Sequence, residues 1–218
     1  MSSSALPTLS SSQVKQVDRL AEEHFGLSVD WLMEAAGWQV ARLVDRRAAV
    51  VCGVGNNAGD GLAAARHLHR WGRLVSVSCV DASRLHGPAA RQLEALRMIG
   101  VAVGDELRLE GAGVIVDAIF GTGLTRPPEG RFAEWIEAIN ASGVEVVAVD
   151  VPSGLDAESG VAYAPCVRAS LTITLGLPKK GLSGRVVVTD IGVPFEAYAA
   201  VGAELPAGLF ARGDVVSL

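Results

Sequence analysis

Short apolar runs alternate with longer segments of helical spacing from residue 48 onward, and this alternation constrains the fold most strongly. Strands that are apolar throughout are buried on both faces, which is typical of parallel sheets covered by helices. The sequence therefore predicts a three-layer, doubly wound α/β domain with a mostly parallel sheet. The expected strands are Ala48–Cys52, Leu74–Val80, Val114–Ile119, Val144–Val149, Leu171–Leu175 and Val186–Val188.

Helical spacing also precedes the first strand. Between Ser10 and Val44 apolar residues recur three and four positions apart, which predicts two extra N-terminal helices divided near Gly26. Residues 1–9 are expected to form a flexible tail and residues 10–218 one domain, because no linker or internal repeat interrupts the alternation. The helices expected between the strands are Gly59–Trp71, Ala89–Ile99 and Phe132–Asn140.

The charge and the lengths of the apolar runs argue against a nucleic acid or a membrane as partner. The 19 basic residues are scattered and the 24 acidic residues outnumber them, which gives a net charge of −5 and argues against nucleic-acid binding. No apolar run is long enough to span a membrane. Cys52 and Cys79 fall in apolar runs, where a thiol is typically a small buried hydrophobe, and no signal peptide is visible. The expected location is the cytoplasm.

Polar residues gather where three of the expected strands end, and ligands of such sheets bind at those carboxyl ends. The first cluster, residues 53–61, reads Gly-Val-Gly-Asn-Asn-Ala-Gly-Asp-Gly. Its glycine spacing matches a dinucleotide-binding turn at a helix N-terminus. Asn56, Asn57 and Asp60 add oxygen ligands to this turn, although each alone is also compatible with turn geometry or with a charge at a helix start.

The other two clusters each carry an acid. Asp117 lies inside an apolar strand, where a buried carboxylate needs a partner or a bound cation, and a loop rich in glycine and proline follows it. Asp150 ends the next strand and is followed by a turn in which Ser153 presents its hydroxyl. Three acid-bearing clusters at three strand ends predict a functional site at that edge of the sheet.

Two further features leave alternatives open. Asp81 ends the second strand, where an acid could bind the ribose of NAD in a dehydrogenase, but a turn or a helix cap is the more common role. Lys179 and Lys180 could reach phosphates, although a solvated basic turn is the more common role of such a pair. The four histidines show no metal-ligand pattern.

The three clusters together resemble a known family. Residues 52–62, 116–124 and 150–156 are similar, in order and spacing, to the three motifs of the NAD(P)H-hydrate epimerases, and residues 32–37 and 175–182 are similar to two further motifs. The resemblance implies a Rossmann-like αβα sandwich, commonly a homodimer. It implies an isomerase that interconverts the R and S forms of NAD(P)H hydrate (NADHX and NADPHX) in metabolite repair, coupled to a separate dehydratase.

The resemblance also assigns roles to residues. Asn57, Asp117 and Ser153 match the ligands of one potassium ion, a hard cation that suits amide, carboxylate and hydroxyl oxygens. Apart from the resemblance, the strand-end positions of Asp150 and Asp60 would bring both within reach of a bound ring, so Asp150 is expected to be the catalytic acid/base, with Asp60 as the alternative. The contacts expected for the dinucleotide hydrate are Asn56, Asn57, Ala58, Gly59, Asp60, Gly121, Thr122, Gly123, Leu124, Thr125, Arg126, Pro127 and Asp150.

Two residues depart from the family pattern, since Ala58 replaces a usual glycine and Ala35 a usual asparagine. A methyl group at position 58 would crowd a ligand if the backbone approached it closely. This keeps a non-catalytic nucleotide-binding domain open as an alternative, and an NAD-dependent dehydrogenase is the third option. Trp31 and Trp38 on the N-terminal helices are expected to cover the sheet or to meet a partner chain.

Overall fold

The computed structural model describes residues 6–211 and 213–218, which form one eight-stranded sheet. The strand order is β3-β2-β1-β4-β5-β6-β7-β8, and neighbouring strands are parallel except for β8, which runs antiparallel to β7. The strands are β1 (Ala48–Cys52), β2 (Leu74–Cys79), β3 (Val103–Gly104), β4 (Val114–Ala118), β5 (Val146–Val149), β6 (Leu171–Leu175), β7 (Val186–Thr189) and β8 (Val215–Ser217).

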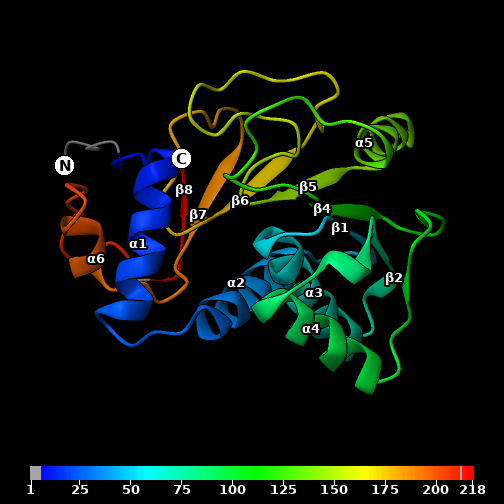
Figure 1. Ribbon diagram of the computed structural model, residues 1–218, viewed down its shortest axis with the longest axis horizontal. Helices are drawn as coiled ribbons and strands as arrows, with labels where there is room; N and C mark the ends of the chain where they lie inside the picture. Colours follow the sequence, from blue (N-terminus) through cyan, green and yellow to red (C-terminus); the bar gives the residue numbers. More distant parts are fainter. Residues whose placement is uncertain (1–5, 212) are drawn as a thin grey trace.

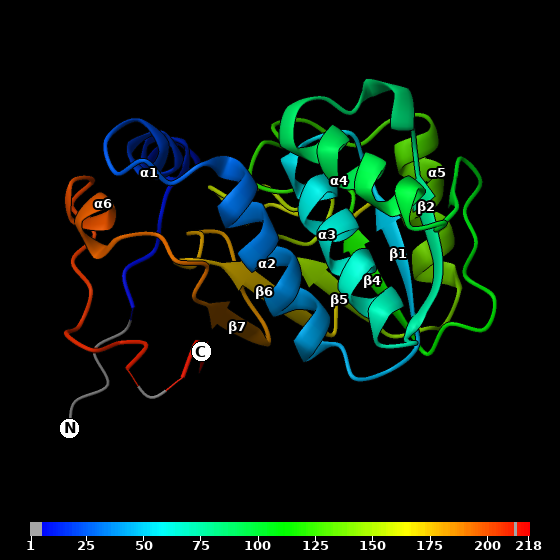
Figure 2. The ribbon, with the colours of Figure 1, turned by 90° about the horizontal axis from the view of Figure 1, so that it is seen from below.

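Helices cover both faces of this sheet (Figure 1). Helices α2, α3 and α4 lie on one face and α5 on the other, while α1 and α6 lie together beside the end of the sheet formed by β7 and β8 (Figures 1 and 2). The α-helices are α1 (Ser11–Glu23), α2 (Val29–Leu43), α3 (Asn56–Arg70), α4 (Gly87–Met98), α5 (Arg131–Ala141) and α6 (Phe195–Ala199).

Successive side chains of a strand point to opposite faces, so the sheet has two cores. Val50 and Val116 belong to the core beneath α2, α3 and α4, whereas Val51 and Ile115 pack against Ile136 of α5. The predicted three-layer αβα sandwich with a mostly parallel sheet and two N-terminal helices is confirmed. Within the described ranges, no helix is both long and apolar enough to cross a membrane.

Several element boundaries differ from the expectation. Helix α3 begins at Asn56 rather than at Gly59. Asparagine disfavours a helix interior because its side chain competes for backbone hydrogen bonds, but the N–H groups of the first turn have no intrahelical partner, so asparagine is tolerated there. Strands β3 and β8 and helix α6 were not expected. They are only 2, 3 and 5 residues long, which is too short for a periodic pattern.

A flexible tail was expected over residues 1–9. Residues 1–5 lie outside the described residues, and for Leu9 the expectation is wrong. Leu9 is buried, and its N–H donates to the Pro178 carbonyl over 2.8 Å. The Lys180 N–H donates in turn to the Leu9 carbonyl over 3.1 Å. Ser10 then caps α1 in a reciprocal pair with Gln13. Backbone pairing with a late segment thus holds the start of the first helix.

The order of the strands places the three polar clusters. The chain moves outward from β1 to β2 and β3, then returns to β4 on the other side of β1. In open sheets of this kind the ligand crevice lies outside the carboxyl ends of the strands at such a reversal. The clusters follow β1, β4 and β5, which are neighbours in the sheet. They therefore meet at one edge, as predicted.

Candidate functional site

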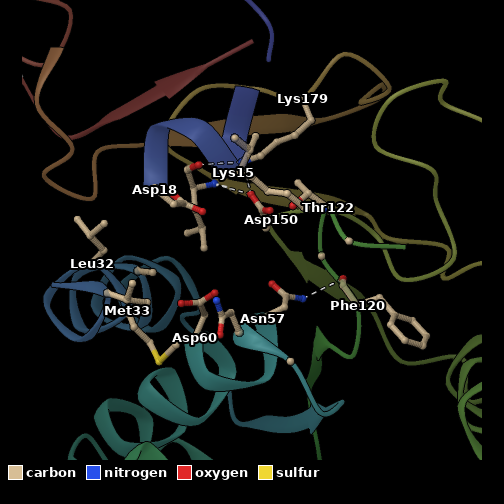
Figure 3. Close-up of a pocket in the computed structure, with 18 of the residues that line it drawn as sticks. Lys15, Asp18, Leu32, Met33, Asn57, Asp60, Phe120, Thr122, Asp150 and Lys179 are labelled. Carbon is tan, nitrogen blue, oxygen red and sulfur yellow. Dashed lines mark hydrogen bonds and ion pairs between the residues drawn. The ribbon is translucent and has the colours of Figure 1, made fainter. Parts of the chain in front are cut away.

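A cavity of about 480 Å³ opens at this edge of the sheet (Figure 3). The start of α3, the loop after β4 and Asp150 after β5 line it, together with Leu175 and Lys179 from the end of β6 and the following loop. Side chains of α1 and α2 complete its wall. Figure 3 shows Asn57 and Asp60 on one wall, with Asp18, Asp150 and Lys179 on the other.

Asp150 adopts an unusual backbone conformation. Its φ is 66°, and among the described residues it is the one non-glycine with a positive φ. Such a conformation is sterically costly for a residue with a Cβ and is concentrated at functional sites. Its Oδ1 accepts hydrogen bonds from the Leu175 N–H at 3.2 Å and the Thr174 hydroxyl at 3.3 Å. The strained turn thereby holds the carboxyl group at the cavity wall.

Lys179 forms an ion pair with Asp150 Oδ1. Its side chain is only 2% exposed, and Nζ also donates to the Leu175 carbonyl at 2.8 Å and the Thr174 hydroxyl at 3.1 Å. The expectation of a solvated basic turn is therefore wrong for Lys179, whereas Lys180 is half-exposed and pairs with Glu158. Burial became possible because a carboxylate 29 residues earlier in the chain supplies the opposite charge.

Two further carboxyl groups face the cavity. Burial at the start of α3 raises the pKa of Asp60 well above its usual range, and the charges of Asp150 and Asp18 add to the shift. The side chain of Asp18 on α1 is exposed, yet desolvation by the surrounding protein atoms raises its pKa to about 6. The Lys179 charge opposes that shift. The cavity thus combines an ion-paired carboxylate with two that hold a proton more readily than usual.

A hydrogen-bonded chain connects the three residues that the resemblance assigns to potassium. The Ser153 hydroxyl donates to Asp117 Oδ1 at 2.6 Å, and the Ser153 N–H donates to Asp117 Oδ2 at 2.8 Å. Ser153 Oγ also accepts from the Phe120 N–H at 2.8 Å. The Phe120 carbonyl in turn accepts from Asn57 Nδ2 at 2.9 Å. The three predicted ligands therefore lie around one turn of backbone after β4.

The donor atoms of this chain fit a hard cation. Asn57 Oδ1 is buried and has no hydrogen-bond partner among the described residues, which leaves an amide oxygen free for an ion. Asp117 is fully buried, and this burial raises the pKa of its carboxyl group to about 6. A cation would compensate a buried carboxylate of this kind. Within the part of the chain described, no cluster of three His, Cys, Asp or Glu side chains could hold a metal.

The expected ligand contacts divide into two groups. Asn56, Asn57, Asp60, Gly121, Thr122, Gly123, Leu124 and Asp150 line the cavity. Ala58, Gly59, Thr125, Arg126 and Pro127 are not among the lining residues. Ala58 and Gly59 lie in the first turn of α3 and face protein: Ala58 is fully buried in the core, and a Cβ at Gly59 would collide with Met33 of α2. The methyl group of Ala58 therefore points away from the cavity. Contact with a ligand stays a prediction for the first group.

Asp81 has a structural role in this fold. Its carboxylate accepts hydrogen bonds from the N–H and the hydroxyl of Ser83, and so caps a short 3-10 turn, Ala82–Arg84. It is not among the residues that line the cavity. The cap predicted as its more common role is confirmed, and the ribose contact that would favour a dehydrogenase has no support from the cavity.

Comparisons with known proteins agree with this geometry. The sequence model of the family described as YjeF-related protein N-terminus matches residues 29–181. An NAD(P)H-hydrate epimerase of Rhodopirellula baltica is 36% identical over 211 residues, which cover 88% of this chain and 86% of that protein. The chain belongs to this family. The resemblance inferred from the sequence motifs is confirmed.

Other relatives extend the match. A bifunctional NAD(P)H-hydrate repair enzyme of Thermofilum pendens is 44% identical over 207 residues, which cover 84% of this chain and 40% of that protein. The chain thus spans about two fifths of the length of that relative. The crystal structure of yeast ynu0 superposes with a TM-score of 0.84 at 26% identity and covers 98% of this chain and 100% of that one. The shared fold therefore extends beyond the segment that the family model matches.

Sequence reasoning missed three charged residues of the cavity wall. Lys179 was noticed but was assigned to solvent, and Lys15 and Asp18 were overlooked. The signal for Asp18 is its spacing: it lies four residues after Val14 and next to Val17, on the border of the apolar face of α1. A carboxylate on the border of the apolar face lies next to the surface against which the helix packs, which here includes the cavity.

Proposed function

We propose that this protein is an NAD(P)H-hydrate epimerase, an isomerase that interconverts the R and S forms of NADHX and NADPHX. The observation that carries the proposal is the cavity at the strand reversal, where a strained, lysine-paired Asp150 faces Asp60 and Asn57. The epimerases among its relatives support the choice of substrate. The buried position of Ala58 removes the one feature that favoured a non-catalytic nucleotide-binding domain.

Binding of the dinucleotide is proposed to use the start of α3 and the loop after β4. Asn56 and Asn57 begin α3 and line the cavity, and the N-terminus of a helix favours the negative charge of a pyrophosphate. Gly121, Thr122, Gly123 and Leu124 line the cavity beside it. We propose that Thr125, Arg126 and Pro127 contact the ligand only where it extends beyond the cavity.

The reaction requires proton transfer. The reacting carbon bears a hydroxyl group next to a ring nitrogen, so inversion occurs by loss and return of the hydroxyl through an iminium, or by ring opening and closing. Asp150 is proposed as the acid/base and Asp60 as the alternative, since both line the cavity from opposite walls (Figure 3). Lys179 would fix the position of the Asp150 carboxyl group.

One potassium ion is proposed to bind Asn57, Asp117 and Ser153. The support is the unpartnered Asn57 Oδ1 beside a fully buried Asp117. When bound, the ion would lower the repulsion between the acidic site and an anionic ligand. Thermal unfolding in potassium chloride and in tetramethylammonium chloride at equal ionic strength tests this directly. Potassium should raise the midpoint of the wild type, and the increase should be lost in Asn57→Leu.

Mixing the protein with R-enriched NADPHX and following the R/S ratio by chromatography tests the activity. The wild type should reach equilibrium faster than the spontaneous reaction, and Asp150→Asn should abolish the acceleration. Asp45→Asn is the control, because that side chain is 86% exposed and is not among the residues that line the cavity. An unchanged ratio with a protein that NADPHX still stabilises against heat would support a non-catalytic binding domain instead.

Three further properties are proposed. Trp31 is 65% exposed and Trp38 40% exposed on the same face of α2, so this apolar surface suits a homodimer contact, measurable by sedimentation equilibrium. The three free cysteines suit the reducing cytoplasm. The bifunctional relatives support coupling to an NAD(P)H-hydrate dehydratase, which an assay of combined repair would detect.

A further inference from the structure

A third carboxylate faces the cavity from a helix outside the sequence motifs. Asp18 lies on α1 and lines the cavity together with Val14 and Lys15, which lie on the same face of that helix. The segment that the family model matches begins only at residue 29. In Figure 3 Asp18 lies beside Asp150 on the wall opposite Asp60. The site is therefore built from more of the chain than its motifs.

Packing on the neighbouring face of α1 holds Asp18 in this position. Val17 and Ala21 are buried in a cluster with Leu177 and Tyr198. Gln13 Nε2 donates to the Val201 carbonyl at 2.9 Å, so the first turn of the helix is also attached. Asp18 thus belongs to a fixed wall of the cavity rather than to a loose end of the chain.

Among the described residues, the carboxyl group of Asp18 accepts no hydrogen bond, whereas that of Asp150 accepts several. Lys179, Thr174 and Leu175 all donate to Asp150 Oδ1. For Asp18, desolvation by the surrounding protein atoms raises the pKa, the Lys179 charge opposes that rise and the Asp150 charge adds to it, and no hydrogen bond contributes among the described residues. The titratable or charged groups around it are Lys15 and Glu22 along α1, Asp60 on α3, Asp150 after β5, Lys179 after β6 and Tyr198 on α6.

We propose that Asp18 is a catalytic residue of the epimerase, which exchanges a proton with the water molecule that leaves or adds on the wall opposite Asp60. This inference rests on the proposed function and deepens it. On the wall shared by the two carboxyl groups, this assigns the proton transfer to Asp18 in place of Asp150. Asp150, held by Lys179, then orients the same water molecule, so its carboxylate is still required for the reaction. Inversion needs a proton-transferring group on each side of the ring, and Asp18 with Asp60 supplies one on each wall.

The step balances without a co-reactant, because water carries the proton left on Asp18 back to Asp60 before the next turnover. In one direction the Asp60 carboxyl group gives its proton to the departing hydroxyl, the carbon–oxygen bond breaks with its electron pair on oxygen, and the ring nitrogen lone pair forms the iminium. Water then adds to the same carbon from the opposite face, and the Asp18 carboxylate takes the proton that is released. The reverse direction exchanges the two roles, because a reaction and its reverse pass through the same states.

The experiment compares Asp18→Asn with Glu22→Gln, which removes an exposed carboxylate from the same helix. With R-enriched NADPHX, Asp18→Asn should lower kcat by about 10²- to 10⁴-fold and leave the calorimetric Kd for NADPHX within about threefold, while Glu22→Gln changes neither. The kcat/KM of the wild type should fall as the pH is lowered through about 6, where Asp18 gains a proton. Asp18→Asn should lack that fall.

Chemical rescue separates catalysis from folding. In Asp18→Ala, formate entering the open cavity should restore part of kcat, with no effect on the wild type or on Glu22→Gln. A kcat for Asp18→Asn within threefold of the wild type overturns the proposal, as does a lowered kcat of Asp18→Ala that formate does not raise in a protein whose thermal midpoint is unchanged. A wild type that never exceeds the spontaneous rate overturns the proposed function itself, and this inference with it.

Discussion

Replacing Lys179 by methionine should destabilise the protein far more than the same change at its neighbour Lys180. Lys179 is buried with its ammonium group against Asp150, and removing one member of a buried ion pair typically costs about 3–5 kcal/mol. Two hydrogen bonds, to the Leu175 carbonyl and the Thr174 hydroxyl, are lost with it. The N–H of Leu175 still serves Asp150, which favours the lower half of that range.

For a chain of this length, roughly 2–4 °C of thermal midpoint accompanies each kcal/mol, so a loss in that lower half should make Lys179→Met unfold roughly 6–16 °C lower. Lys180 pairs with Glu158 at 2.9 Å in a half-exposed position, where such pairs contribute about 0–1 kcal/mol. Lys180→Met is therefore the matched control. Scanning calorimetry at pH 7 measures both, and urea unfolding converts the difference into a free energy.

A double variant identifies the cause of the loss. Asp150→Asn in the Lys179→Met background removes the uncompensated charge, and asparagine tolerates the positive φ of that position. The double variant should lose less stability than the sum of the two single variants, by about 0.5–3 kcal/mol. Equal losses for the two lysine variants, or a strictly additive double variant, would refute the argument that the buried pair holds this turn.

Three other perturbations have defined outcomes. Gly53→Ala places a Cβ against the Ile119 carbonyl oxygen and should cost about 1–3 kcal/mol in urea unfolding, whereas Gly123→Ala, whose Cβ meets no atom within 4 Å, should stay within about 0.5 kcal/mol. Ser153→Ala removes the acceptor of the Phe120 N–H and a donor to Asp117, so a loss of about 1–3 kcal/mol is expected, against almost none for the exposed Ser159→Ala. Asp18 has a folded pKa of about 6, above the 3.8 of an unperturbed carboxyl group, so the folded chain binds more protons between these values and its stability falls as the pH rises through them. Asp18→Asn should therefore gain in thermal midpoint relative to the wild type between pH 4 and pH 7, and an unchanged difference would contradict the raised pKa.

The parallel sheet was predictable because each of its strands can be identified from a short run of neighbouring residues. Runs such as Ala48–Cys52 are apolar at every position, and only a strand covered on both faces can bury such a run. The three polar clusters then follow from the rule that parallel strands place their carboxyl ends at one edge. Asp117, Asp150 and Ser153 were found in this way, before any contact between them was known.

Residues whose environment depends on distant parts of the chain were not predictable in this way. The burial of Lys179 depends on Asp150, and the place of Asp18 depends on how α1 packs against Leu177 and Tyr198. Trp31 illustrates the opposite error, since an aromatic side chain at helical spacing is usually buried, yet this one is 65% exposed. The spacing of apolar residues in one segment predicts which side of a helix or strand is apolar, but it does not predict which residues pack against that side.

The docking of α1 against residues 177–203 also bears on how the chain matures during translation. The ribosome releases α1 first, but its buried partners Leu177, Val193, Ala197 and Tyr198 follow only after most of the sheet has been synthesised. At about 5–20 residues per second the first helix waits on the order of ten seconds or more without its partners. During that time the apolar face of α1 is exposed to chaperones or to a neighbouring nascent chain, and the cavity wall that carries Asp18 is still missing.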